Sequence, residues 1–175
     1  MIIFLDFDGV LHPSTVYLRG GKPILDGDGE LFMWAPLLIN ALSEFSACKI
    51  VLSTNWVRRL GFESTCDLLP VGLRERVIGS TWHSVMETPR YNDGLTLSYW
   101  NDATRFQQIK HWAQFNKLHL NEWIAVDDDA SGWPDSDSDN LVLLNGRAGL
   151  SDATKLGMLK SKLSSYQVSS VDFLS

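Results

Sequence analysis

The sequence predicts an α/β fold, in which helices flank a doubly wound and mainly parallel sheet. Short, continuous apolar runs recur along the chain, as expected of strands that are covered on both faces. Helical patterns with capping signals separate these runs, which is typical of strands and helices that alternate. The chain has 175 residues, 45% of them hydrophobic and 21% charged, as in an ordinary globular protein. We expect one domain over residues 1–175.

Five segments are expected to form the strands of this sheet. The first, IIFL at residues 2–5, is a continuous apolar run that suits a central parallel strand. Three later runs have the same character, and a fifth is weaker. These four are KIVLS at 49–53, EWIAV at 122–126, NLVLL at 140–144 and the weaker RVIG at 76–79.

Three helices are expected between or after these strands. They span residues 35–47, 101–115 and 151–163. Pro36 suits the first turn of the first helix, Asn101 or Asp102 the N-cap of the second, and Ser151 the N-cap of the third. Residues 56–100 are expected to contain several short helical pieces, and residues 131–140 a polar loop.

A small hairpin is expected to interrupt this alternation just after the first strand. In YLRGGKPIL, residues 17–25, two β-like arms flank Gly20 and Gly21, a pair that suits the positive φ angles of a tight hairpin turn. We expect a flap at about residues 12–33. The stretches between the predicted strands leave room for only small insertions.

Charge and cysteine content exclude several classes of protein. The formal net charge is −6, which disfavours extended nucleic-acid binding or docking on an anionic membrane. Cys48 and Cys66 lie far apart and indicate neither a disulfide framework nor a zinc site. Neither a transmembrane run nor a leader is expected, so a cytoplasmic location is the prediction.

Acidic and hydroxyl side chains follow three of the predicted strands. They are Asp6 and Asp8 after the first strand, Ser53, Thr54 and Asn55 after the second, and Asp127, Asp128 and Asp129 after the run at 122–126. In open α/β sheets, ligands bind beyond the carboxyl ends of the strands. Carboxylates gathered there repel one another unless a hard cation neutralises them, and Mg2+ suits such ligands. The sequence therefore predicts a Mg2+ site that accepts a phosphate.

The spacing of the first two aspartates suggests separate roles. Asp6 and Asp8 lie two residues apart on an extended segment and can face the same side. Asp6, nearest the rigid strand, suits a nucleophile that forms an aspartyl phosphate. Asp8 suits a general acid and base, and Gly9 allows the chain to turn sharply after it.

These motifs resemble those of the haloacid dehalogenase-like (HAD) phosphohydrolases, which have a Rossmann-like fold. DFDGVL at residues 6–11 looks like the first motif of that superfamily, DxDG(T/V)(L/V), Ser53 like the second, and AVDDD at 125–129 like the fourth. The resemblance implies that Asp6 is the nucleophile, Asp8 the acid and base, and Ser53 or its rival Thr54 the hydroxyl that holds the phosphoryl group. It also implies that Asp6, the backbone carbonyl of Asp8 and Asp128 bind Mg2+, with Asp127 as a direct or outer ligand.

The third motif of that superfamily is a single Lys or Arg near the start of the helix before the fourth. Arg105 is the expected residue and Lys110 the alternative. The STNW, RVIGSTW and GLSDAT stretches also look similar to small capless HAD domains of bacteria and phages, some of them modules of RNA-repair proteins. Such a domain is expected to have an open site.

The resemblance predicts a phosphatase, and two other functions are kept as alternatives. One is a phosphotransferase with the same site, and the other is a non-catalytic module that binds Mg2+ and phosphate. The expected partner is a phosphorylated substrate, either a small molecule, a nucleic-acid end or a phosphoprotein. Besides Thr54, Asn55 and Gly9, Trp56 is expected to contact it at the site mouth as a stacking surface. Arg58, Arg59 and His83 are expected to be solvated charges, with a distal substrate phosphate as their alternative ligand.

Overall fold

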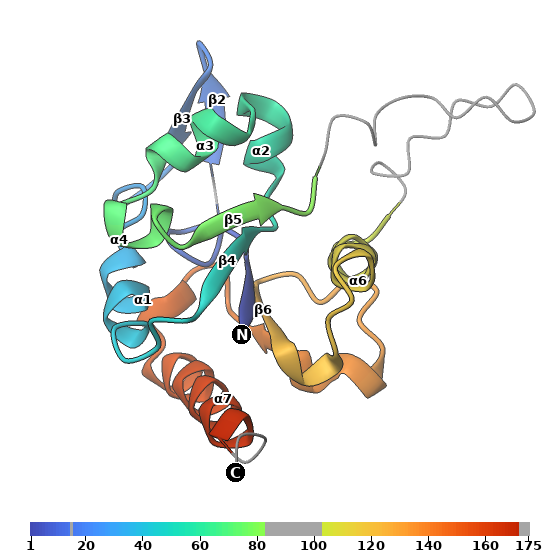
Figure 1. Cartoon of the computed structure of the whole chain (residues 1–175). Coiled ribbons are helices and arrows are strands. Elements are labelled where there is room, and N and C mark those ends of the chain that lie inside the picture. The colour runs from blue at the N-terminus through green and yellow to red at the C-terminus, as the bar shows by residue number, and fades with distance from the viewer. Residues whose placement is uncertain (15, 83–102, 172–175) are drawn as a thin grey trace, which may run out of the picture.

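A computed structural model describes residues 1–14, 16–82 and 103–171 of the chain. Its main sheet is parallel and has five strands in the order β5-β4-β1-β6-β7 (Figure 1). The strands are β1 (Ile2–Leu5), β4 (Lys49–Leu52), β5 (Val77–Ser80), β6 (Trp123–Asp127) and β7 (Leu141–Leu143). Each corresponds to one of the five predicted strands, and the predicted α/β class is confirmed.

The strand order creates a crevice at the carboxyl end of the sheet. From β1 in the centre, the chain adds β4 and β5 on one side and then returns to add β6 and β7 on the other. Strand order therefore reverses beside β1, and ligands of open α/β sheets bind at such a reversal. The segments that follow β1, β4 and β6 meet there.

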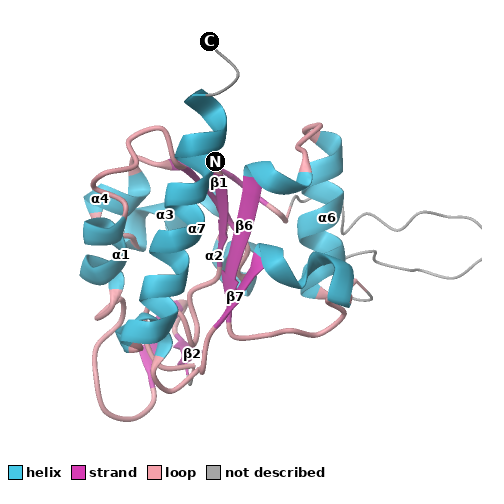
Figure 2. Ribbon diagram, turned by 90° about the horizontal axis from the view of Figure 1, so that it is seen from below, coloured by secondary structure: helices cyan, strands magenta, loops and turns pink. Residues whose placement is uncertain are grey.

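Helices cover both faces of the sheet (Figure 2). Helix α6 lies on one face, and α1, α3, α4 and α7 lie on the other. The described α-helices are α1 (Ala35–Ala41), α2 (Asn55–Leu60), α3 (Phe62–Leu68), α4 (Val71–Arg74), α6 (Arg105–Phe115) and α7 (Ala153–Val171). Three short 3-10 helices are η2 (Leu120–Glu122), η3 (Asp135–Asn140) and η4 (Gly149–Ser151). None of the described helices has both the length and the apolar character needed to cross a bilayer.

Alternate residues of β1 supply the two halves of the core. Ile3 and Leu5 belong to a large apolar cluster that includes Leu38 of α1 and Leu159 of α7. Phe4 points to the other face and packs with residues of α6 and β6. Each of these side chains is fully buried, and burial of one such side chain stabilises the fold by about 1.5–3 kcal/mol. This two-sided packing fixes where β1 ends, and therefore where Asp6 lies.

Local capping differs from the prediction at two helices. Thr104 caps α6 by accepting a hydrogen bond from the backbone N–H of Gln107, whose side chain accepts one from the backbone N–H of Thr104 in return. This capping box replaces the expected caps Asn101 and Asp102, which lie outside the described residues. The cap of α7 is Asp152 rather than Ser151, because the Asp152 carboxylate accepts hydrogen bonds from the backbone N–H groups of Thr154 and Lys155 in the first turn.

Two other segments also differ in detail from the prediction. Helix α1 ends at Ala41, although the prediction extended it to residue 47. The expected polar loop at residues 131–140 forms the 3-10 helix η3 over its second half.

The predicted flap is confirmed as an antiparallel hairpin of β2 (Val16–Arg19) and β3 (Lys22–Leu25). Gly20 and Gly21 form its turn with φ angles of 59° and 76°, the positive values that such a two-residue turn requires. The hairpin stands near α2 at the carboxyl end of the sheet (Figure 1). No large cap domain occurs within the described ranges.

Candidate active site

Asp6 follows β1 and lies buried at the centre of the crevice. Its backbone N–H donates to the carbonyl of Val126 at 3.1 Å, which ties the end of β1 to β6. The Asp6 Oδ1 accepts the backbone N–H of Phe7 at 2.8 Å, and Oδ2 lies 3.3 Å from an Arg105 nitrogen that donates to it. Burial raises the pKa of Asp6, and Arg105 opposes that rise. The carboxylate is thus held in one orientation beside a cation.

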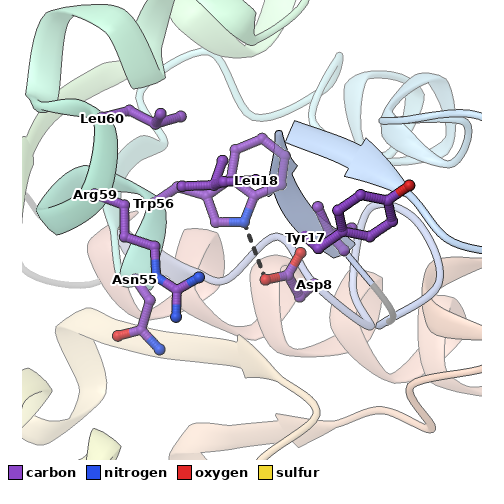
Figure 3. Close-up of a pocket in the computed structure, with 8 residues that line it drawn as sticks. Asp8, Tyr17, Leu18, Asn55, Trp56, Arg59 and Leu60 are labelled. Carbon is purple, nitrogen blue, oxygen red and sulfur yellow. Dashed lines mark hydrogen bonds between the residues drawn. The ribbon is translucent and has the colours of Figure 1, made fainter. Parts of the chain in front are cut away.

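The two oxygens of Asp8 accept hydrogen bonds from two different aromatic side chains. The His12 Nε2 lies 3.1 Å from Oδ1 of Asp8, and the Trp56 indole N–H donates to Oδ2 at 3.0 Å (Figure 3). The Nδ1 of His12 accepts the backbone N–H of Phe32 at 3.3 Å. Because Nδ1 is an acceptor, the ring proton lies on Nε2, and His12 donates to Asp8.

Neither of these two contacts to Asp8 was predicted from the sequence. His12 is fully buried and contacts Asp8. Trp56 is buried, with its indole N–H turned to Asp8, and it also lines a pocket beside that residue. Its expected contact with the substrate stays a prediction. A turn places His12 beside Asp8, since the backbone N–H of Leu11 donates to the carbonyl of Phe7. The spacing of four residues between Asp8 and His12 was the available signal.

Backbone strain accompanies the contact to His12. Phe32 has a φ of 61°, a left-handed conformation that is unusual for a bulky residue and costs about 1–3 kcal/mol. Its ring packs edge-on against Phe7, His12 and Trp56 at centroid distances of 5.2–5.6 Å. This packing holds the strained residue so that its N–H meets the imidazole.

Asp127 and Asp128, at the end of β6, join Asp6 in one acidic cluster. One carboxylate oxygen from each of the three residues lies within 4.8 Å of the others. Burial and the neighbouring carboxylates raise the pKa of Asp127 well above its ordinary value and that of Asp128 to about 6. Asp129, the third aspartate after the run at 122–126, is exposed.

Two glycines leave the space that the Asp128 carboxylate occupies. A Cβ at Gly9 would lie 2.1 Å from Oδ2 of Asp128, and one at Gly146 would lie 2.5 Å from the same oxygen. Gly9 also has a φ of 70°, which favours glycine. The sequence suggested Gly9 for its sharp turn, but nothing in it pointed to Gly146. Contact between the two loops appears only once the chain is folded.

Arg105 is the cation that lies inside this cluster. It opens α6 directly after the Thr104 cap, and its Nε lies 3.2 Å from Oδ2 of Asp127. Burial disfavours its charge, but the carboxylates of Asp6 and Asp127 outweigh that effect and raise its pKa. Lys110, its alternative, instead pairs with Asp137 at 2.6 Å. Of the two candidates, only Arg105 contacts the acidic cluster.

Hydroxyl and amide groups after β4 line the same crevice end. The backbone N–H of Ser53 donates to the carbonyl of Leu5, and its buried hydroxyl has no hydrogen-bond partner among the described residues. An unsatisfied buried hydroxyl costs about 1–3 kcal/mol unless a ligand completes it. Thr54 instead caps α2 by accepting the backbone N–H of Trp56, and its hydroxyl lowers the pKa of Asp6. Asn55 is exposed at the first turn of α2.

The cluster fits a hard divalent cation. Its donors are carboxylate oxygens, which Mg2+ prefers. Burial and mutual repulsion raise the pKa values of these carboxylates, and a bound cation would offset both effects. Oδ2 of Asp127 is buried and accepts no hydrogen bond from any described residue, because Arg105 reaches it with poor hydrogen-bond geometry. That oxygen remains available as a ligand.

Three charged residues were expected to be solvated, and the structure describes two of them. His83 lies outside the described residues. Arg58 and Arg59 are exposed on α2, and of these two Arg59 lines a pocket next to Asp8.

Comparison with known proteins agrees with the fold. The family described as "HAD domain in Swiss Army Knife RNA repair proteins" matches residues 2–154, a range that contains every strand of the sheet. Searches of curated proteins and of solved structures gave no match. Because the family match covers most of the chain, this protein belongs to the HAD domains of Swiss Army Knife RNA repair proteins.

Proposed function

We propose that this protein is a Mg2+-dependent phosphatase that forms an aspartyl phosphate on Asp6. The single observation that supports this most strongly is the convergence of Asp6, Asp127 and Asp128 beside Arg105. Family membership supports phosphohydrolase chemistry in general. The positions of the side chains support the remaining steps.

Asp6, the backbone carbonyl of Asp8 and Asp128 would hold Mg2+, with Asp127 as a direct or outer ligand. When bound, Mg2+ would neutralise these carboxylates and stabilise charge on a phosphate. Arg105 would pair with the nucleophile and with the phosphate, and Ser53 would donate its unpaired hydroxyl to a phosphate oxygen. These contacts would orient the phosphorus for attack by Asp6.

In the first step, an oxygen of Asp6 attacks phosphorus and the bond to the leaving oxygen breaks. Asp8 gives its proton to that leaving oxygen. In the second step, Asp8 takes a proton from water, and the water oxygen attacks phosphorus. The bond to Asp6 then breaks, releasing phosphate and restoring the carboxylate.

His12 and Trp56 would act as positioning residues in this cycle. Each donates a hydrogen bond to one oxygen of Asp8, so the carboxyl group has little freedom to rotate. General acid catalysis depends on that orientation, because the proton must reach the leaving oxygen within hydrogen-bond distance. Neither residue needs to touch the phosphate to influence its transfer.

A phosphorylated nucleic-acid end is the substrate class we favour for this site. The family is described by its occurrence in RNA repair proteins, and processing of such ends is a phosphomonoester reaction. The flap hairpin, rather than a large cap, flanks the described site, and this favours access by a bulky substrate over a small sugar phosphate.

Phosphate release from p-nitrophenyl phosphate with Mg2+ tests the proposed activity. Asp6→Asn is expected to lower kcat at least about 1,000-fold, because it removes the nucleophile while keeping nearly the same shape. Asp26→Asn, which makes the same change at an exposed position beside the flap, is the matched control and is expected to keep full activity. An active Asp6→Asn variant would refute the mechanism, and wild-type protein that binds Mg2+ but turns over no phosphate ester would refute the activity.

A further inference from the structure

A small pocket opens beside Asp8, between strand β2 of the flap and helix α2 (Figure 3). Its volume is about 110 Å3, well below the ~300–1,000 Å3 of pockets that enclose a drug-sized ligand. It therefore suits one group of a larger substrate. Trp56 lines the pocket, and its indole N–H donates a hydrogen bond to Asp8. The pocket therefore lies directly beside the proposed acid.

The position of Asp8 determines which part of a substrate would enter this pocket. This step rests on the proposed function, in which Asp8 protonates the leaving oxygen. The transferred phosphorus must lie at Asp6 and the leaving oxygen at Asp8. The group joined to that oxygen then continues past Asp8, where the pocket begins.

The chemistry of the pocket indicates what that group is. Arg59 and Asn55 approach from α2, and Tyr17 lies on the opposite side, as Figure 3 shows. No ion pair joins Arg59 to a carboxylate of the described residues. A guanidinium and an amide facing one pocket suit a phosphate, because both donate hydrogen bonds and the first carries charge.

Tyr17 adds a second contact of a different kind. Its side chain is 45% exposed at the pocket edge, so a ligand can reach the ring. An exposed aromatic ring can stack on a nucleic-acid base of any sequence. A phosphate and a base are parts of one nucleotide unit, so one ligand could make both kinds of contact.

We propose that this pocket binds the nucleotide unit next to the scissile terminal phosphate. Arg59 and Asn55 contact the internucleotide phosphate, and Tyr17 stacks on the neighbouring base. The substrate class is therefore a phosphate-terminated nucleic-acid strand rather than an isolated nucleotide. The acidic surface does not oppose this, because only one internucleotide phosphate is contacted.

The test compares two phosphorylated dinucleotides that differ in one linkage. One has an ordinary internucleotide phosphodiester and the other an uncharged methylphosphonate, with the same terminal phosphate on both, and a mononucleotide serves as the reference. Wild-type protein is expected to show kcat/KM about tenfold higher for the phosphodiester than for the methylphosphonate. Arg59→Gln is expected to abolish that difference.

Arg58→Gln is the matched control, because it removes the same charge from the adjacent position of α2 without lining the pocket. It is expected to keep the tenfold difference. Equal kcat/KM values for the two dinucleotides in wild-type protein, an equal effect of both arginine variants, or a stronger preference for a phosphopeptide would overturn the proposal. Turnover of p-nitrophenyl phosphate in the same preparation separates these results from failure of the proposed phosphatase activity.

Discussion

The Nε2 of His12 lies 3.1 Å from Oδ1 of Asp8 and carries the proton of that contact. The imidazole is fully buried and is fixed from behind by the backbone N–H of Phe32. Asp8 is therefore held in place by side chains that lie outside the DFDG segment. This relationship can be tested separately from the nucleophile.

Replacement of His12 should affect poor leaving groups most. His12→Ala frees Asp8 to rotate, so kcat/KM for an alkyl phosphate should fall about 10- to 100-fold. The value for p-nitrophenyl phosphate should fall less than about threefold, because that leaving group departs without a proton. Steady-state kinetics on both substrates measures the split, and circular dichroism checks the fold.

Two further variants make this test specific. His12→Gln retains an N–H donor and should recover part of the lost rate, whereas His111→Ala, on the exposed side of α6, should behave as wild type. Equal losses on both substrates would show that His12 supports the fold rather than the acid.

Arg105 should matter for both stability and rate. Arg105→Gln leaves Asp6 and Asp127 without their shared cation, and breaking a buried pair costs about 3–5 kcal/mol of unfolding free energy. We expect kcat to fall at least about 100-fold as well. Urea unfolding and phosphate release measure the two effects.

Lys110→Gln is the matched control for that change. It breaks the more exposed pair with Asp137, so it should cost about 1 kcal/mol or less of unfolding free energy and keep its activity. Loss of activity in Lys110→Gln with retention in Arg105→Gln would reverse the assignment.

Gly9 should be intolerant of a side chain. In Gly9→Ala the new Cβ meets the Asp128 carboxylate in a left-handed backbone conformation, so Mg2+ affinity and turnover should both fall about tenfold or more. Gly20→Ala also has a positive φ, but nothing lies within 4 Å of its Cβ. It should lose some stability and no Mg2+ affinity. Titration calorimetry would distinguish them, and equal Mg2+ binding by both variants would contradict the role of this space.

Metal-free protein should lose stability as pH rises through the titration of Asp128. Its pKa is about 6 in the folded state against an ordinary 3.8, so the folded state binds the proton more tightly. Unfolding free energy should therefore fall between about pH 4 and pH 6. Asp128→Asn should remove about 1–2 kcal/mol of that fall, a figure that allows for solvent screening.

Urea unfolding in a chelator at pH 4.5 and pH 7.5 measures this difference. Added Mg2+ should restore stability at pH 7.5 because it binds the folded state, and its affinity should weaken below about pH 6 as protons compete for Asp128. A stability difference between Asp128→Asn and wild type that does not change with pH would contradict the predicted coupling.

Much of the fold could be predicted because local patterns determine it. The apolar runs and the Gly20-Gly21 turn placed every strand of the described structure within a residue or two. Helix ends were less predictable, since several polar residues near Thr104 could serve as caps. The Thr104–Gln107 pair was a readable capping-box signal that the prediction missed.

The site residues that follow strands could be predicted, but the contacts between loops could not. Asp6 and Asp128 follow continuous apolar runs, so parallel strands had to bring them to one edge. The donors to Asp8 come from a turn and from a helix 48 residues away. Gly146 reaches Asp128 from yet another loop. The contacts of Trp56 and Gly146 depend on how distant segments pack, which residue spacing does not encode, whereas only the four-residue spacing of Asp8 and His12 gave a local signal.

The most direct test of the central claim is chemical trapping of the phosphorylated aspartate. Protein quenched during turnover of p-nitrophenyl phosphate with Mg2+ would be reduced with borohydride, which converts an aspartyl phosphate to homoserine, and then digested for peptide mass spectrometry. The mechanism predicts that homoserine appears at Asp6 and depends on substrate. Active protein that acquires homoserine at another aspartate, or at none, would contradict it.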